Sequence, residues 1–263
     1  MLKVAITGGS EGLGLELCKI FAQKPRCQVI TCGRRKLEDV CELKNLINIL
    51  YQQIDLSKDI ERQTFIKFVF QEFGLVDILI NNAVTCYDTD LLHKNDLLSF
   101  NEHFYLNSFV PIDLSLGFYN KLKQNKSCSN HCSFIMINSE SAIQPLNPHL
   151  AYYAASKAAL LNLTRSLALA VVDNINFSFC TLMLGPLATP YYKEFYKDKA
   201  QKLSTTTEEL ISKKMKQKFP GSSISRLITP SEVAESILYL HGMREAKNAM
   251  LLKLDAGAIP III

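Results

Sequence analysis

A tyrosine doublet followed by a lysine is the first group in this sequence that could do chemistry. The stretch "AYYAASKAAL" (151–160) places Tyr152 and Tyr153 ahead of Lys157. In a helix, residues four positions apart lie on one face, whereas direct neighbours point about 100° apart. Tyr153 and Lys157 therefore share a face, and Tyr152 does not.

This pair could move protons to and from a substrate. A free phenol has a pKa of about 10, which is too high for a proton shuttle near neutrality. A cation about 4 Å away contributes roughly 4 kcal/mol at an effective dielectric constant of about 20, and one pKa unit corresponds to about 1.4 kcal/mol. We therefore expect Lys157 to lower the pKa of Tyr153 by up to about three units, which would make Tyr153 a usable acid and base.

A glycine-rich turn could bind phosphate. The stretch "TGGSEGLG" (7–14) follows an apolar segment and opens a segment of helical period. Gly8, Gly12 and Gly14 would let the backbone turn sharply and approach a pyrophosphate, and the helix N-terminus supplies free N–H groups and a partial positive charge. The turn therefore predicts a dinucleotide site.

The end of the second apolar segment, "TCGRRK" (31–36), indicates which dinucleotide would bind. An acid at this place usually binds the ribose 2′-hydroxyl of NAD. Arg34 and Arg35 occupy the region instead, and a guanidinium suits a 2′-phosphate. We therefore expect NADP(H) rather than NAD(H). Glu11 in the glycine turn argues the other way, and an exposed helix start is the alternative interpretation of the two arginines.

Composition limits the class of protein. The chain has 263 residues, 48% of them hydrophobic, and a formal net charge of +4. That is enough apolar material for a large core, and the mild charge does not indicate a nucleic-acid partner. No apolar run is long enough for a membrane helix, and "LKVAIT" directly after Met1 leaves no room for a signal peptide. We expect a cytoplasmic protein with reduced cysteines.

A metal site is not expected. The stretch "CSNHC" (128–132) is the only cluster of possible metal ligands, with Cys128, His131 and Cys132. It has no second ligand pair nearby, which makes a poor metal site. None of the five histidines has a partner at catalytic or metal-binding spacing.

Short apolar segments alternate with longer segments of helical period along the whole chain. This alternation predicts an α/β fold with a doubly wound, parallel, seven-stranded, Rossmann-like sheet, and 1–263 as a single domain. The expected strands are 2–7, 27–32, 48–54, 76–81, 132–138, 176–183 and 249–255. The expected helical segments are 12–24, 35–47, 58–73, 96–123, 150–172, 190–218 and 230–242.

Several motifs in order resemble those of the short-chain dehydrogenase/reductase family. The glycine turn has the spacing Gly-x-x-x-Gly-x-Gly, and "NNA" (81–83), "YAASK" (153–157) and "GPLAT" (185–189) follow. The resemblance covers nearly the whole chain. It implies an oxidoreductase that transfers a hydride between NADP(H) and a carbonyl or secondary alcohol, with Tyr153 as general acid and base.

The resemblance also assigns roles to the other catalytic residues. Lys157 would hold the nicotinamide ribose, Ser139 would orient the carbonyl, and Asn107 would support a water molecule that connects Lys157 to solvent. Ser141 is a rival to Ser139, which is favoured because it directly follows the apolar strand.

The implied cofactor contacts come from the ends of several strands. They are Gly8, Ser10, Gly12, Leu13, Gly14, Arg34, Arg35, Asp55, Leu56, Asn82, Ala83, Tyr153, Lys157, Gly185, Leu187 and Thr189. Asp55 resembles an acid that contacts adenine, and an ordinary helix N-cap is the alternative. Two positions depart from the family pattern: Val84 replaces a glycine and Leu184 replaces a proline.

The insert 190–225 is where the family builds a substrate lid. Between 190 and 220 it carries eight Lys against four Asp and Glu, after the aromatic run Tyr191, Tyr192, Phe195 and Tyr196. It could form an apolar pocket wall with a basic rim for an acyl carrier or another anion, or simply a solvated helix pair. We expect a small-molecule carbonyl or alcohol as substrate.

The apolar tail "GAIPIII" (257–263) predicts a subunit interface, and hence a homodimer or homotetramer. A catalytically silent, cofactor-bound regulatory or scaffold protein of the same fold is the competing function, and Val84 and Leu184 are the residues that allow it. A nucleotide-sugar epimerase is a third hypothesis, but the extra C-terminal domain of those longer relatives is missing.

Overall fold

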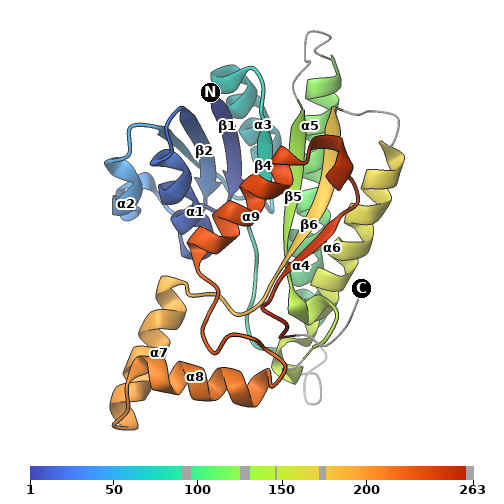
Figure 1. Ribbon diagram of the computed structural model, residues 1–263. Helices are drawn as coiled ribbons and strands as arrows, with labels where there is room; N and C mark the ends of the chain where they lie inside the picture. Colours follow the sequence, from blue (N-terminus) through green and yellow to red (C-terminus); the bar gives the residue numbers. More distant parts are fainter. Residues whose placement is uncertain (90–95, 125–130, 146, 172–175, 259–263) are drawn as a thin grey trace.

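A parallel sheet forms the centre of the molecule. The computed structural model describes residues 1–89, 96–124, 131–145, 147–171 and 176–258. Within them, seven parallel strands form one sheet in the order β3-β2-β1-β4-β5-β6-β7 (Figure 1). The strands are β1 (Leu2–Thr7), β2 (Cys27–Gly33), β3 (Ile49–Gln53), β4 (Ile78–Asn81), β5 (Cys132–Ser139), β6 (Phe177–Leu184) and β7 (Leu251–Leu254). The predicted α/β fold, a doubly wound seven-stranded parallel sheet in a single domain, is confirmed.

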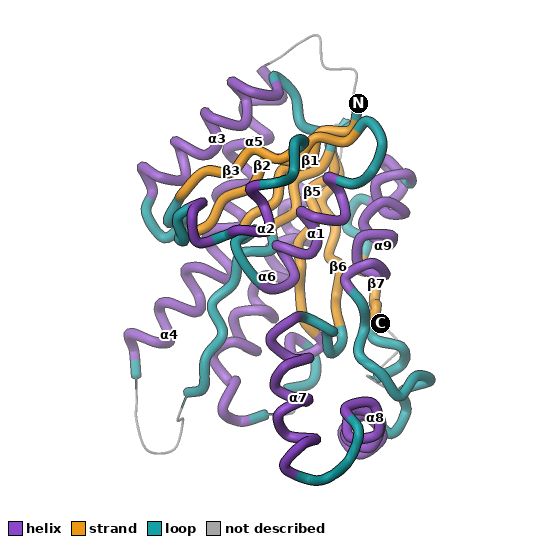
Figure 2. The backbone as a smooth tube through the Cα atoms, turned by 90° about the vertical axis from the view of Figure 1, so that its left-hand side faces the viewer, coloured by secondary structure: helices purple, strands orange, loops and turns teal. Residues whose placement is uncertain are grey.

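Helices cover both faces of the sheet (Figure 2). The helices are α1 (Gly12–Ala22), α2 (Cys41–Lys44), α3 (Asp59–Phe73), α4 (Leu97–Phe104), α5 (Val110–Gln124), α6 (Ala151–Ala170), α7 (Pro190–Lys202), α8 (Thr207–Lys218) and α9 (Pro230–Gly242). Helices α3, α5 and α6 share one apolar cluster with the sheet, and α1 and α9 share another. Among the described helices, none has the length and apolar character that crossing a bilayer would require.

The central strand β5 shows why its sequence needs two covered faces. Phe134 and Met136 belong to the cluster of α3, α5 and α6, whereas Ile135 and Ile137 belong to the cluster of α1 and α9. Successive side chains of a strand point to opposite faces, so a continuous apolar run is stable only between two layers of helices. Burial of each such side chain contributes about 1.5–3 kcal/mol.

Two predicted helical segments differ from the structure. The segment 35–47 forms only a 3-10 turn (Leu37–Asp39) and the four-residue α2. Within this segment only Val40 and Leu43 are buried, so little apolar surface is available to stabilise a longer helix. The segment 96–123 is a helix interrupted by a π-helical stretch, Tyr105–Phe109.

The strand order reverses beside β1, which pairs with β2 on one side and β4 on the other. Chain connections leave this point in opposite directions, so a crevice opens outside the carboxyl ends of these strands. The glycine turn (7–14) and the start of helix α6, which carries Tyr153 and Lys157, both lie at this edge of the sheet.

The opposite edge holds a buried polar cluster. The amine of Lys247, which is fully buried, donates to the carbonyl of Arg244 at 2.9 Å and lies 3.1 Å from Nε2 of His131. His241 Nδ1 lies 2.8 Å from the hydroxyl of Ser133. Burial lowers the pKa of His241 from 6.5 to about 4, and the nearby charges of Lys247 and Arg244 add to the effect.

This cluster predicts how stability depends on pH. The folded state keeps His241 neutral down to about pH 4, whereas the unfolded chain protonates it below 6.5. The unfolded state therefore binds more protons in this window, and the free energy of unfolding should fall as the pH drops from 6.5 toward 5, by on the order of 1 kcal/mol after allowance for solvent screening.

Urea denaturation at the two pH values measures this effect. The change in free energy of unfolding between pH 6.5 and pH 5 should be mostly lost in His241→Asn. It should persist in His149→Asn, which alters an exposed position. Equal pH dependence in both variants would contradict the assignment.

Candidate active site

A cavity of about 990 Å³ opens at the carboxyl edge of the sheet. It runs from the end of β2 past the glycine turn and β5 to helix α8. The predicted site residues that line it are Gly8, Ser10, Gly12, Leu13, Arg34, Arg35, Asp55, Leu56, Asn82, Ala83, Ser139, Tyr153, Lys157, Gly185, Leu187 and Thr189. Gly14 and Asn107 do not line it.

The glycine turn packs too tightly for side chains. A Cβ added at Gly8, where φ is +72°, would stand 2.9 Å from the Cα of Ala83. A Cβ added at Gly14 would stand 2.1 Å from the carbonyl oxygen of Gly8. Gly14 therefore lets α1 approach β1 closely, and its neighbours Gly12 and Leu13 face the cavity. The open backbone at the start of α1 suits a phosphate group.

Thr7 ties this turn to the end of β4, a role that sequence reasoning missed. Its hydroxyl accepts hydrogen bonds from the backbone N–H groups of Asn82 (2.9 Å) and Ala83 (3.0 Å). The Asn82 side chain returns a bond to the carbonyl of Thr7 at 3.0 Å. A threonine at the end of an apolar strand carries no distinctive signal in sequence, because its partners are 75 and 76 residues away.

Arg34 and Arg35 both face the cavity at the end of β2, and neither begins a helix. The Arg35 guanidinium donates to the carbonyls of Ser10 and Asp39. Among the described residues, the exposed guanidinium of Arg34 has no hydrogen-bonding partner. Both arginines are exposed, and the 3-10 turn begins only at Leu37, so the expected helix start at position 35 is not present. Glu11 also lines the cavity, and its side chain makes no capping bond to α1.

Asp55 is not the N-cap of the helix that follows it, since Lys58 holds that position in α3. One carboxylate oxygen of Asp55 accepts hydrogen bonds from the backbone N–H (3.0 Å) and hydroxyl (2.7 Å) of Ser57. Partial burial acts against ionisation, but these bonds prevail and lower the pKa of Asp55. It thus presents a charged carboxylate beside the cavity.

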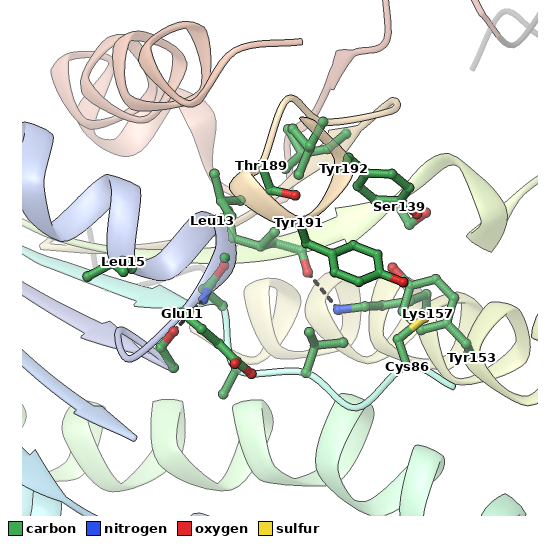
Figure 3. A pocket seen from close by; sticks show the side chains of 18 of the residues that line it. Glu11, Leu13, Leu15, Cys86, Ser139, Tyr153, Lys157, Thr189, Tyr191 and Tyr192 are labelled. Atoms are coloured by element: carbon green, nitrogen blue, oxygen red, sulfur yellow. Dashed lines mark hydrogen bonds between the residues drawn. The ribbon is translucent and has the colours of Figure 1, made fainter. Parts of the chain in front are cut away.

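Helix α6 places the predicted catalytic pair at the end of β5. The buried amine of Lys157 donates to the carbonyl of Ile137 at 2.9 Å and lies 6.0 Å from the centre of the Tyr153 ring. Asn138 donates in return to the carbonyl of Lys157 at 3.1 Å. Figure 3 shows the hydrogen bond that the Lys157 amine donates, next to the side chains of Tyr153 and Cys86. Tyr152 packs edge-on against Phe100, away from the cavity.

The sequence predicted that Lys157 lowers the pKa of Tyr153. This prediction is wrong when only the protein's own groups act, because together they raise that pKa. Burial is the largest effect and raises the pKa of Tyr153, although a hydrogen bond with Ser139 acts the other way. Burial also lowers the pKa of Lys157 to about 8, and the thiol of Cys86 partly opposes this. The expectation from sequence assumed a cation at about 4 Å and an effective dielectric constant of about 20, whereas desolvation of the buried phenol dominates here.

Ser139 is the serine that interacts with the candidate catalytic tyrosine. Its side chain acts to lower the pKa of Tyr153, and its hydroxyl accepts a bond from the backbone N–H of Ser141 at 3.2 Å. Ser141 also lines the cavity, but the contact with the phenol favours Ser139 as the residue that would orient a carbonyl.

Asn107 lies behind the catalytic helix, inside the π-helical stretch that interrupts α4 and α5. Its side-chain oxygen accepts from the backbone N–H of Thr85 at 2.8 Å, and its amide donates to the Thr85 carbonyl at 2.9 Å and to the hydroxyl of Ser156 at 3.0 Å. Ser156 in turn donates to the carbonyl of Tyr153 at 2.7 Å. Asn107 therefore links the segment after β4 to the turn of α6 that carries the tyrosine.

The two departures from the family pattern leave the cavity open. Val84 lies at its wall with its side chain 46% exposed, and Leu184 is buried at the end of β6. Gly185 still donates its N–H to the carbonyl of Leu254 at 2.9 Å, and Thr189 precedes α7 as its N-cap. Neither replacement removes a proton donor or a phosphate-binding group.

Helices α7 and α8 lie next to each other below the sheet (Figure 1), and both contribute residues to the far end of the cavity. Tyr191, Tyr192 and Tyr196 of α7 line it, and of the eight lysines between 190 and 220 only Lys214 and Lys218 do so. Most of the basic surplus therefore points elsewhere.

Two predictions, on the "CSNHC" cluster and on the apolar tail, concern segments that the structure describes only in part. Cys128 of the "CSNHC" cluster and positions 259–263 of the apolar tail are not described. Among the residues that are, no group of three or more His, Cys, Asp or Glu side chains is arranged to hold a metal ion.

Known relatives match along the full length. The chain is 28% identical over 259 residues to the uncharacterized oxidoreductase YvrD of Bacillus subtilis (strain 168). The aligned residues cover 97% of this chain and 95% of the relative. It is 25% identical over 251 residues to the D-beta-hydroxybutyrate dehydrogenase of Rhizobium meliloti (strain 1021), with 92% of each chain covered.

Solved structures and a family model agree with these relatives. The L-sorbose reductase of Gluconobacter frateurii, complexed with NADPH and L-sorbose, superposes with a TM-score of 0.84 at 22% identity over 99% of this chain and 98% of that one. The model of the short chain dehydrogenase family matches residues 3–200. The protein therefore belongs to the short-chain dehydrogenase/reductase family of oxidoreductases.

Proposed function

We propose that this oxidoreductase reduces a small-molecule carbonyl with NADPH, or runs the reverse oxidation of a secondary alcohol, with Tyr153 as general acid and base. One observation carries the proposal: a single cavity joins the glycine turn and Arg34 to Ser139, Tyr153 and Lys157. A cofactor laid along it would span the distance between phosphate-binding and proton-donating groups.

The residues present fit a dinucleotide phosphate. A Cβ at Gly8 would meet Ala83 at 2.9 Å, so glycine there keeps the turn close to the end of β4. The open backbone at the start of α1 would suit a pyrophosphate. The guanidinium of Arg34, which has no hydrogen-bonding partner in the described part of the chain, suits the 2′-phosphate of NADP(H), and Lys157 would hold the nicotinamide ribose. When bound, the nicotinamide supplies or takes up the hydride. NADPH in the structurally similar L-sorbose reductase supports this choice.

The chain's own groups would handle the proton. Burial raises the pKa of Tyr153 and so makes its phenol a weaker acid at neutral pH. The charge of Lys157 would offset this as the phenol donates to the oxygen of a carbonyl that Ser139 orients. Lys157, with its pKa lowered to about 8, remains largely charged at pH 7 and would stabilise the phenolate that forms. Asn107 would support a water molecule on the route from Lys157 to solvent. The segment 190–225, with α7 and α8, would act as the substrate lid.

Replacing Tyr153 with Phe tests the catalytic role. The variant keeps the ring and loses the proton donor, so kcat/KM for carbonyl reduction should fall by about 10²–10⁴-fold, with NADPH affinity preserved. Decay of NADPH absorbance with a panel of carbonyl compounds measures the first quantity and fluorescence titration the second. Tyr152→Phe is the matched control and should behave as wild type. Undiminished biological activity in Tyr153→Phe would instead support the silent regulatory protein.

Arg34 should determine the preference for NADPH over NADH. Loss of a charge-assisted hydrogen bond to the 2′-phosphate costs about 1.5–3 kcal/mol, so Arg34→Gln should weaken NADPH binding by about tenfold or more. NADH binding, measured by the same fluorescence titration, should change little. Lys36→Gln, two positions further on and outside the cavity, is the control. Equal loss for both cofactors in Arg34→Gln would refute the assignment.

We also infer that a second copy of the chain covers part of α5 and α6. Phe109, the last residue of the π-helical stretch before α5, is 49% exposed, and Leu116 on α5 is 39% exposed. Leu163 and Leu169 on α6 are 41% and 58% exposed. Light scattering after size exclusion should give a dimer or tetramer, and Leu163→Glu should shift it toward the monomer. A wild-type monomer at micromolar concentration would contradict this.

A further inference from the structure

A buried carboxyl group directly after Ser139 has no role in the proposed reaction. Glu140 begins the 3-10 turn Glu140–Ala142, is only 7% exposed, and lines the same cavity as Ser139 and Tyr153. It comes from the end of β5, on the side of the cavity that faces α8. Sequence reasoning passed over it, because an acid after a strand usually faces solvent.

One oxygen of this carboxyl group is unsatisfied. Among the described residues, Oε2 of Glu140 is buried and has no hydrogen-bond partner. It lies against the turn after β6, where a Cβ added at Gly185 would stand 3.4 Å from it. Because this oxygen has almost no accessible surface, the carboxyl group must turn toward the cavity to bond a ligand through it. Leaving a buried acceptor unpaired costs about 1–3 kcal/mol, and more for a charged group. Folded proteins keep few such groups, and those they keep are often functional.

The charges around Glu140 limit what could pair with it. Burial raises the pKa of Glu140 to about 7; Lys218 of α8 acts in the opposite direction, and Asp255 after β7 adds to the rise. Both protonation states are therefore populated near neutral pH. Asp255 is buried beside it and Lys253 pairs with Asp255 at 3.4 Å.

These charges disfavour an ionic ligand group at this place. An anion would meet the carboxylate of Glu140, with the buried Asp255 adding to the repulsion, and a cation would meet Lys218, with Lys214 one helical turn away on the same cavity wall. A neutral hydroxyl group avoids both costs. It can donate to the carboxylate, and it can donate to or accept from the protonated acid.

We propose that Glu140 is a specificity-determining residue that hydrogen-bonds a hydroxyl group of the substrate, so that the preferred substrates are neutral hydroxyketones and the corresponding diols. This inference rests on the proposed function, because it places the hydroxyl near the carbonyl that Ser139 and Tyr153 hold. Since Glu140 adjoins Ser139, the hydroxyl lies on a carbon close to the reacting one.

Matched ketones test the proposal. The substrates are 2-butanone, 3-hydroxy-2-butanone and 4-hydroxy-2-butanone, assayed with NADPH, and the quantity is the ratio of kcat/KM for each hydroxyketone to that for 2-butanone. Comparing this ratio between proteins cancels the intrinsic reactivity of the ketones. Glu140→Met should lower it by about tenfold or more for at least one hydroxyketone, as loss of about 1.4 kcal/mol would.

Two further variants sharpen the comparison. Glu140→Gln keeps a hydrogen-bonding group of the same size and should retain most of the preference. Glu235→Gln, at an exposed position on α9 outside the cavity, should keep the wild-type ratio. A ratio in Glu140→Met within about twofold of wild type for both hydroxyketones would overturn the proposal, because that is less than about 0.5 kcal/mol.

Binding without turnover separates this inference from the proposed function. In the Tyr153→Phe background with saturating NADPH, ligand-observed NMR titration should show that Glu140→Met weakens hydroxyketone binding by about tenfold. If wild type reduces no ketone but this loss of binding is seen, the proposed reaction fails and the hydroxyl site stands. If ketones are reduced and binding is unchanged, the hydroxyl site fails.

Thermal stability distinguishes binding from a structural role. Replacing an unpaired buried carboxyl group with an apolar side chain of similar size should leave the melting temperature unchanged or raise it. A lowered melting temperature with an unchanged substrate ratio would show that Glu140 supports the fold, and would overturn the proposal.

Discussion

The junction between helix α6 and strand β5 is the contact on which the candidate site depends. The amine of Lys157 donates to the carbonyl of Ile137, and the amide of Asn138 donates back to the carbonyl of Lys157. These reciprocal bonds are buried, so each would be costly to break. They hold the catalytic helix at one height above the sheet, and this brings Tyr153 to Ser139.

A second set of buried bonds extends that junction to the cofactor side of the cavity. Ser156 connects the Tyr153 turn to Asn107, and Asn107 clamps Thr85. Two residues before Thr85, Ala83 is held by the hydroxyl of Thr7. The glycine turn, the end of β4 and the catalytic helix are thus joined through backbone groups, which is how a rigid site is built from distant segments.

Burial changes the chemistry that spacing alone suggests. The same desolvation raises the pKa of Tyr153, lowers that of Lys157 to about 8 and raises that of Glu140 to about 7. The raised pKa keeps the phenol protonated but makes it a weaker acid, so the charge of the neighbouring amine would have to offset that cost when the proton leaves. The carboxyl group next to them can exist in either form, which suits a partner that is itself uncharged.

The sequence alone determined the seven parallel strands, their alternation with helices, and the candidate catalytic and phosphate-binding residues, because apolar periodicity and the short glycine and Tyr-x-x-x-Lys spacings are local. Only the tertiary structure decided the direction of the Tyr153 pKa shift, the position of Ser139 next to Tyr153, the contacts of Thr7 and the burial of Glu140. These depend on desolvation and on partners such as Asn82 or Gly185, which lie 75 and 45 positions away along the chain. No local pattern encodes such contacts; the packing of β1, β4, β5 and β6 creates them.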